Sequence, residues 1–249
     1  MGLLPLQKLI SVKRQKIKEL LQIEGQGQDC LVRGWVRSFR SNRFIALNDG
    51  SAIHNLQLVL DYEKFSELEL KRVTVGSCIQ ATGKLNPSIG EGQKVELLIE
   101  ELKILGDADP SIYPLQPKRH SLEFLRQIAH LRFRTNTFSA VFRIRHYAAF
   151  AIHQFFHLKG FYYLHTPIIT ASDAEGAGEM FRVTTLDPVH PPKTEDGKVD
   201  YAQDFFGKET NLTVSGQMEG ELGAMALSKI YAFGTTFRAE NSNTSRHLA

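Results

Sequence analysis

The most informative segment of the sequence is IYAFGTTFRAENSNTSRH, residues 230–247. Its first half is rich in aromatic and apolar residues, which favours a β-strand, and this half ends in Phe-Arg-x-Glu at 237–240. A strand would hold Arg238 at its tip on a rigid element, with Glu240 on the same face. The planar guanidinium suits a phosphate or a carboxylate, although a surface hairpin with solvated charges is the simpler alternative.

The string FRAENSNTSRHLA, residues 237–249, resembles the motif 2 strand and loop of class II aminoacyl-tRNA synthetases, in the form carried by asparaginyl-tRNA synthetases. The strings SDAEGAGEMFRVTTLD at 172–187 and LTVSGQ at 212–217 carry the same resemblance, which extends from about Val32 to Ala249. In that family motif 2 continues into a second strand. We therefore expect an incomplete catalytic half and no activity from the 249-residue piece alone.

The first hundred residues change to a period of two after a predicted basic helix at 8–23. Strands are expected at 31–39, 43–47, 53–60, 77–85 and 94–105, with a tight hairpin turn at 48–51 and a helix at 61–71. Five strands with a helix between the third and fourth are typical of an OB-fold barrel, which binds oligonucleotides across strands 2 and 3.

Basic and aromatic side chains are interleaved along the first two of these strands. Aromatic rings can stack on unpaired bases while arginines hold the phosphate backbone. We expect Trp35 to lie in the core, and Phe44 and the arginines, Arg33 among them, to contact RNA; a solvated basic edge is the alternative. The resemblance implies an anticodon-binding module for tRNA(Asn), in which Phe44 stacks on the central anticodon base and Gln57 hydrogen-bonds it.

Residues 107–135 combine prolines with acids followed by bases, which is a linker composition. Its basic end is as consistent with RNA contact as with a solvated hinge. The predicted fold is α+β: an OB-fold β-barrel at 1–106, a hinge at 107–135, and part of a class II synthetase antiparallel-sheet catalytic domain at 136–249.

The second half begins with a helix opened by Ser121 and a longer one from Thr137 to Leu158, whose apolar positions we expect to be core. His153 and His157 on that helix have metalloprotease spacing, but Gln154 replaces the general base and no metal site is predicted. A strand at 161–170 resembles motif 1, the dimer interface of the family, and Pro167 matches its proline; a simple edge strand is the alternative. Residues 187–210 indicate a disordered loop or lid, and 218–228 a helix with an apolar core face.

The amino-acid pocket is assigned by the resemblance. It implies that Glu175 and Gln217, with Ser215 beside them, bind the α-amino group of asparagine. Glu221 would accept a hydrogen bond from the carboxamide and repel a second carboxylate, and Gly220 stands where the aspartate enzymes have a lysine. Without the resemblance Glu221 is an ordinary exposed helix acid.

The nucleotide site is assigned in the same way. Arg238 would grip the α-phosphate of ATP and the substrate carboxylate, and Glu240 would contact the adenine side. Arg246 and His247 would reach the outer phosphates or the tRNA acceptor end. The second ATP-binding arginine and the ligands of Mg²⁺ are expected beyond residue 249.

Composition limits the remaining possibilities. A hydrophobic fraction of 42% excludes wholesale disorder, and a net charge of +3 leaves any RNA-binding surface local. Cys30 and Cys78 are expected to be free thiols in a reducing compartment, and with no apolar membrane run and no signal peptide in the sequence we expect a cytosolic protein. Two alternatives stay open: a non-catalytic RNA-binding OB-fold module, and an aspartate-type ligase, against which Glu221 argues.

Overall fold

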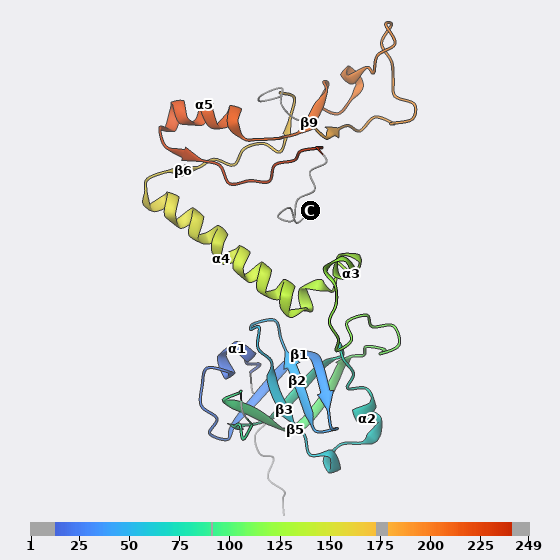
Figure 1. Ribbon diagram of the computed structural model, residues 1–249, viewed down its shortest axis with the longest axis vertical. Coiled ribbons are helices and arrows are strands. Elements are labelled where there is room, and N and C mark those ends of the chain that lie inside the picture. The colour runs from blue at the N-terminus through green and yellow to red at the C-terminus, as the bar shows by residue number, and fades with distance from the viewer. Residues whose placement is uncertain (1–12, 91, 173–178, 241–249) are drawn as a thin grey trace, which may run out of the picture. The chain divides into compact units, whose positions relative to one another are not determined.

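The computed structural model of the chain describes residues 13–90, 92–172 and 179–240. They fall into two compact units, divided between Ile144 and Arg145, and each unit is considered by itself (Figure 1). The predicted domain boundaries after residues 106 and 135 stay a prediction.

The first unit is built on a closed five-stranded barrel, which confirms the predicted fold. Its strands are β1 (Gln28–Arg40), β2 (Phe44–Asn48), β3 (Leu56–Val59), β4 (Cys78–Pro87) and β5 (Val95–Gly106). They are ordered β1-β2-β3-β5-β4, and all neighbours are antiparallel except β3 and β5. Inward-facing aliphatic side chains from every strand fill the barrel, as the alternating pattern requires.

The alternation of β1 places Trp35 on the outer face together with Arg33, and the prediction of a core tryptophan is wrong. Val32 and Val36 are buried, whereas Trp35 is 36% exposed. The guanidinium carbon of Arg134 lies 4.8 Å from the centre of the indole ring. Trp35 is therefore partly covered by a cation–π contact on the outer face, where the period of two places it.

The connections of the barrel differ from the sequence predictions in three places. The predicted helix at 61–71 is two short pieces, the 3₁₀ turn η1 (Tyr62–Lys64) and α2 (Glu67–Lys71), because Ser66 forms a capping box with Glu69 and must itself be extended. The hairpin turn at 48–51 is a longer loop, since β3 begins only at Leu56. Of the helix predicted at 8–23, α1 covers Ile17–Leu20, while residues 8–12 lie outside the described part.

The segment after the barrel is anchored to it by several contacts. Arg72 makes two 2.7 Å hydrogen bonds to the carboxylate of Asp107, and the hydroxyl of Thr74 donates to the carbonyl of Ala108. Ser121 caps α3 (Leu122–Gln127) as predicted. A second 3₁₀ turn, η2 (Arg132–Arg134), follows. The start of this segment is therefore attached to the barrel, and its role as a hinge stays a prediction.

The long helix α4 (Asn136–Leu158) runs from the first unit into the second. Its start is confirmed to within one residue, and Thr135 caps it by accepting from the backbone N–H of Phe138. Beyond it, the elements are β6 (Tyr162–Tyr163), β7 (Ile169–Thr170), β8 (Arg182–Val183), η3 (Tyr201–Gln203), β9 (Thr210–Leu212), α5 (Gln217–Leu227) and β10 (Ile230–Tyr231).

Two small sheets organise the second unit. One is antiparallel with the order β7-β9-β8, and the other pairs β10 with β6 in parallel. The continuous strand predicted at 161–170 is wrong, because Pro167 lies in a break between β6 and β7. Proline cannot donate to a ladder, so the break falls where its position predicts.

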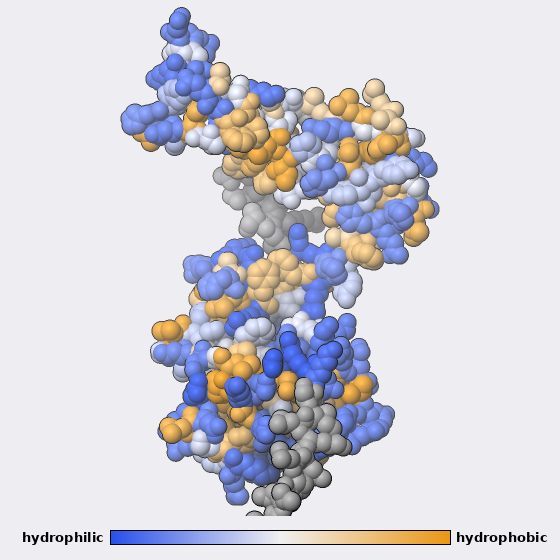
Figure 2. All heavy atoms as spheres, turned by 180° about the vertical axis from the view of Figure 1, so that it is seen from behind, coloured by the Kyte–Doolittle hydropathy of each residue, from blue (hydrophilic) through white to orange (hydrophobic). Residues whose placement is uncertain are grey.

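The apolar faces of α4 and α5 were expected to be core, and this prediction is wrong. Neither helix has a fully buried residue, and side chains such as Phe155 and Met225 are 57% and 84% exposed. Figure 2 shows hydrophobic residues open on the surface of this unit. Within the described residues, no further layer packs on these faces, so helical periodicity alone did not produce burial.

The loop after β8 was expected to lack structure, and this prediction is also wrong. Asp204 is only 7% exposed and accepts hydrogen bonds from the hydroxyls of Thr184 and Thr185 and from the backbone N–H of Thr185. A bridge between Lys193 and Val199 and the turn η3 add local order. Whether the loop moves as a lid stays a prediction.

Candidate functional site

Two of the predicted pocket residues meet at the first turn of α5. Gln217 is the first residue of the helix, and Glu221 follows one turn later on the same face. The side-chain amide of Gln217 donates a 3.0 Å hydrogen bond to the carboxylate of Glu221. The hydroxyl of Ser215 accepts from the backbone N–H of Gln217 at 3.3 Å. These three residues therefore form one polar group.

Arg238 lies on a backbone segment that runs beside the strand leading to this group. The N–H of Phe237 donates to the carbonyl of Thr213 at 2.9 Å, and that of Ala239 donates to Glu179 at 2.8 Å. Arg238 stands between them and is exposed, and its side chain faces the opposite way from its two half-buried neighbours. The bonded backbone thus brings Arg238 close in the fold to Ser215.

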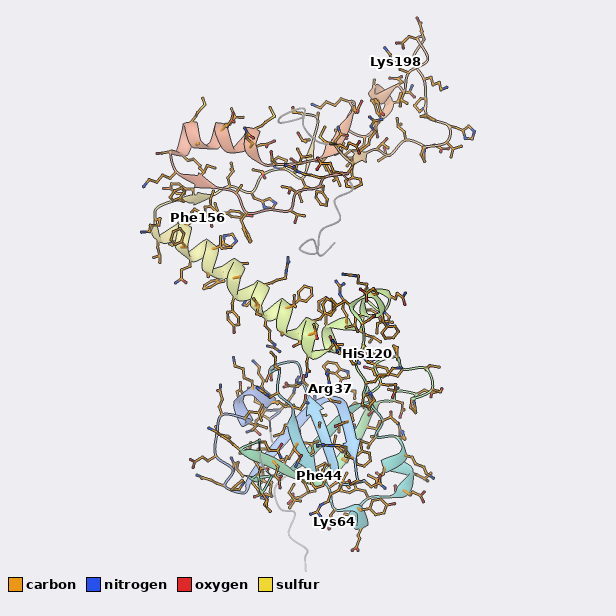
Figure 3. All side chains as sticks on the ribbon, viewed as in Figure 1. Arg37, Phe44, Lys64, His120, Phe156 and Lys198 are labelled. Atoms are coloured by element: carbon orange, nitrogen blue, oxygen red, sulfur yellow. The ribbon has the colours of Figure 1, made fainter. Side chains whose placement is uncertain are left out.

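The strand predicted to carry Arg238 is shorter than the sequence indicated. β10 covers only Ile230–Tyr231, because β6 offers a partner edge for just two residues. Tyr231 is fixed further by a 2.6 Å hydrogen bond between its hydroxyl and the ring nitrogen Nδ1 of His153. Phe156, labelled in Figure 3, stacks on the ring of Tyr231 with centroids 4.6 Å apart. Packing of an aromatic cluster, rather than a long strand, fixes the start of this segment.

Several predicted residues have no contact that tests their role. Glu175, Arg246 and His247 lie outside the described residues. Glu240 and Pro167 are both exposed. Across residues 13–90, 92–172 and 179–240, no three His, Cys, Asp or Glu side chains converge in a way that could hold a metal ion.

The predicted base-binding residues lie together on the outer face of β2 and β3. Gln57 on β3 pairs with Ala46 on β2. Phe44 lies two residues before Ala46 on the same face, so the side chains of Phe44 and Gln57 are diagonal neighbours. Phe44, labelled in Figure 3, is half-buried. The guanidinium carbon of Arg43 lies 5.6 Å from its ring centre. The amide of Gln57 donates to Glu96 at 3.2 Å.

A hollow of about 630 Å³ opens beside Gln57. Its lining residues are Leu21, Arg40, Ala46, His54, Asn55, Gln57, Gly92, Gln93 and Lys94. Sequence reasoning missed His54, Asn55 and Lys94, because it placed them in the predicted strands at 53–60 and 94–105, whereas in the structure they lie in the connections before β3 and β5. An open hollow with amide, imidazole and cationic groups can bind an unpaired nucleotide.

The remaining arginines of β1 are engaged elsewhere. Arg33 donates to the amide oxygen of Gln80 at 2.7 Å, on the β4 side of the barrel. Arg37, labelled in Figure 3, donates to the side chain of Asn136 at 3.2 Å. Burial lowers the pKa of Arg37, and the nearby charge of Arg134 lowers it further. The structure therefore groups Phe44 with Gln57, and it places Arg33 apart from them.

The comparison with protein families matches both halves of the chain. Residues 121–249 match the family of class II tRNA synthetases (D, K and N), and residues 30–105 match the OB-fold nucleic acid binding domain. The chain belongs to the class II tRNA synthetases of the D, K and N group.

Within that class, the similar curated proteins are asparagine–tRNA ligases. The chain is 62% identical over 243 residues to the one from Cytophaga hutchinsonii and 58% identical over 241 residues to the one from Porphyromonas gingivalis. These alignments cover 96% of this chain but 52% and 51% of the relatives, so the chain spans about half the length of the curated relatives it matches.

Solved structures share the fold at lower identity. Asparaginyl-tRNA synthetase from Pyrococcus horikoshii, complexed with asparaginyl-adenylate, superposes with a TM-score of 0.75 at 21% identity, covering 95% of this chain and 51% of that one. The enzyme from Entamoeba histolytica gives 0.73 at 22% identity, with the same coverage. No helix among the described residues has the length and apolar character to cross a membrane.

Proposed function

We propose that this chain forms the anticodon-binding and amino-acid-binding part of an asparagine–tRNA ligase. Such an enzyme uses ATP to activate asparagine and transfers it to tRNA(Asn). The observation that carries the proposal is the hydrogen-bonded pair Gln217–Glu221, which lies close in the fold to the segment of Arg238. A carboxylate acceptor at this point suits a carboxamide substrate and opposes a carboxylate one. The high identity to asparagine–tRNA ligases supports the same substrate.

The first step needs positioning more than acid–base chemistry. Arg238 binds the α-phosphate of ATP and the carboxylate of asparagine, and so brings two anions together. A carboxylate oxygen attacks the α-phosphorus in line, the bond to the bridging oxygen breaks, and pyrophosphate leaves. Gln217 and Glu175 bind the ammonium group, while Glu221 accepts from the carboxamide.

In the second step the terminal ribose hydroxyl of the tRNA attacks the activated carbonyl, and AMP leaves. We assign Glu240 to the adenine side, and Arg246 and His247 to the outer phosphates or the acceptor end. When bound, Mg²⁺ supplies charge neutralisation at the phosphates. Among residues 13–90, 92–172 and 179–240 no three His, Cys, Asp or Glu side chains converge, so we assign none of them to Mg²⁺.

The barrel selects the tRNA. Phe44 stacks on the central anticodon base, and Gln57 hydrogen-bonds its edge from the diagonal position on β3. Arg33 contacts the backbone further along β1. We also propose a cytoplasmic location and a homodimer in which Pro167 lies at the interface.

A non-catalytic RNA-binding module is the second candidate, because the best-formed core is that of the barrel. Its inward side chains are almost fully buried, whereas both long helices of the second unit leave apolar side chains exposed. An aspartate-type ligase is the third, supported only by a shared fold with an Entamoeba histolytica aspartyl-tRNA synthetase at 19% identity.

A chimaeric ligase tests the catalytic proposal. In it this chain replaces the matching half of the Cytophaga hutchinsonii asparagine–tRNA ligase, and amino-acid-dependent pyrophosphate exchange is measured with asparagine, aspartate and lysine. We expect exchange with asparagine, lost on Arg238→Ala. Exchange with aspartate in preference, or none with a folded chimaera, would contradict the proposal.

RNA binding is tested on the 249-residue chain itself, by titrating a labelled anticodon stem-loop of tRNA(Asn). Phe44→Ala should weaken binding roughly 5- to 150-fold, since stacking on one base contributes about 1–3 kcal/mol. Phe205→Ala removes an exposed ring from the loop after β8, which belongs to the second unit rather than to the barrel, and should leave affinity unchanged. Equal losses from both variants would refute the assigned surface. If RNA binds but the chimaera does not exchange, the binding module is the better description.

A further inference from the structure

The hydrogen bond between Gln217 and Glu221 has a direction that chemistry fixes. An ionised carboxylate has no hydrogen to donate, so its amide partner must present the NH₂ end. Nε2 of Gln217 lies 3.0 Å from Oε1 of Glu221. The carbonyl oxygen Oε1 of Gln217, at the other end of the same amide group, is therefore not used by Glu221 and is available as an acceptor.

We propose that Gln217 is a positioning residue for Glu221, in addition to its contact with the substrate's ammonium group. The inference rests on the proposed function. The ammonium of asparagine donates to Oε1 of Gln217, whose NH₂ orients the carboxylate of Glu221. The second carboxylate oxygen of Glu221 then accepts from the carboxamide NH₂. One chain of hydrogen bonds thus joins both ends of the substrate.

The position of the pair on α5 favours this role. Gly216, Gly220 and Gly223 follow the helical period along the side of α5 that meets Thr166, Ile230 and Leu164. Gln217 and Glu221 occupy the neighbouring stripe of the helix and are exposed. Both side chains are therefore free to face a ligand. The backbone bond from Phe237 to Thr213 brings Arg238 close in the fold to this end of the helix.

An ordinary surface pair is the competing interpretation, because residues four apart on a helix often hydrogen-bond without further purpose. The same unit contains another amide–carboxylate pair for comparison, three residues apart. The amide of Gln203 donates to the carboxylate of Asp200 at 2.8 Å, in the turn η3. Breaking that bond provides a matched control.

The test uses the chimaeric ligase and compares kcat/KM for asparagine and aspartate. Gln217→Glu keeps the length of the side chain and an oxygen for the ammonium, but it cannot donate to Glu221 as a carboxylate. We expect the preference for asparagine over aspartate to fall by roughly tenfold or more. Gln203→Met should leave that preference unchanged.

The exchanged pair, Gln217→Glu with Glu221→Gln, gives the decisive result. It restores an amide–carboxylate hydrogen bond, now donated by position 221, and leaves the carbonyl oxygen of that amide for the substrate NH₂. We expect kcat/KM for asparagine to recover above that of either single variant. The positioning role would be overturned if kcat/KM for asparagine did not recover in the double variant, or if Gln217→Glu kept the preference of the parent for asparagine over aspartate. Absence of asparagine exchange in the folded parent chimaera would instead reject the proposed function.

Discussion

Gly216 is the position at which a small change should disturb the candidate pocket most. A Cβ atom there would lie 2.6 Å from Oγ1 and 2.8 Å from Cγ2 of Thr166. Ordinary contact begins at 3.4 Å, so the closer approach falls short by 0.8 Å. Thr166 belongs to the segment between β6 and β7, while Gly216 directly precedes α5. Gly216→Ala should therefore shift the start of α5, together with Gln217.

The size of the effect follows from that overlap. Overpacking of this kind costs about 1–3 kcal/mol of stability. A shift approaching 1 Å at a reacting group can cost on the order of 10²-fold in rate. We predict that asparagine-dependent pyrophosphate exchange by the chimaeric ligase falls roughly 10- to 100-fold in Gly216→Ala, while the protein still folds by circular dichroism.

A compensating change tests the cause. Thr166→Ala removes Oγ1 and Cγ2, so the nearest remaining contact is its Cβ at 3.0 Å. The double variant should recover most of the lost exchange, because neighbouring substitutions that share a clash are not additive. Gly90→Ala in the barrel, where the nearest atom is 3.7 Å away, is the control. Normal exchange in Gly216→Ala, or no recovery in the double variant, would refute this reasoning.

Two further predictions concern stability. A Cβ at Gly83 would lie 1.9 Å from the carbonyl oxygen of Leu98. Gly83→Ala should therefore lower the Tm of the barrel by roughly 5–20 °C. The same Tm for Gly83→Ala and Gly90→Ala would contradict this prediction. The hydrogen bond from Thr184, followed by those from Thr185, lowers the pKa of Asp204 below its ordinary 3.8. Its contribution to stability is therefore full well above 3.8, begins to fall as pH drops to that value, and is gone below the lowered pKa. Thermal melts from pH 7 to 3 should show a smaller loss of stability in Asp204→Asn than in the parent chain, and identical slopes would count against the assignment.

The barrel was predictable because its strands alternate strictly, and Val32, Val36 and Ile45 could face only inward. The same pattern already placed Trp35 outside, and the expectation of a core residue gave too much weight to its size. The exposed faces of α4 and α5 do not follow from amphipathic spacing, which states which side is apolar but not whether another element covers it.

The candidate site was predictable only in part. Gln217 and Glu221 were identified from a resemblance, and helical spacing alone would have placed them one turn apart without a role. The hollow beside Gln57 was missed because His54 and Lys94 come from separate connections, and only the closed barrel brings them together. Asp204 carried no sequence signal, as its partners precede it by about twenty residues.

The anchoring of the segment after β5 bears on how such proteins can be recombined. Arg134 covers Trp35, Arg37 reaches Asn136, and Asp107 is paired with Arg72. If the barrel were joined to another protein directly after β5, these side chains would lose their partners. Exchange of such barrels between related proteins is therefore expected to succeed when the junction is moved into α4, so that residues 107–135 travel with the barrel.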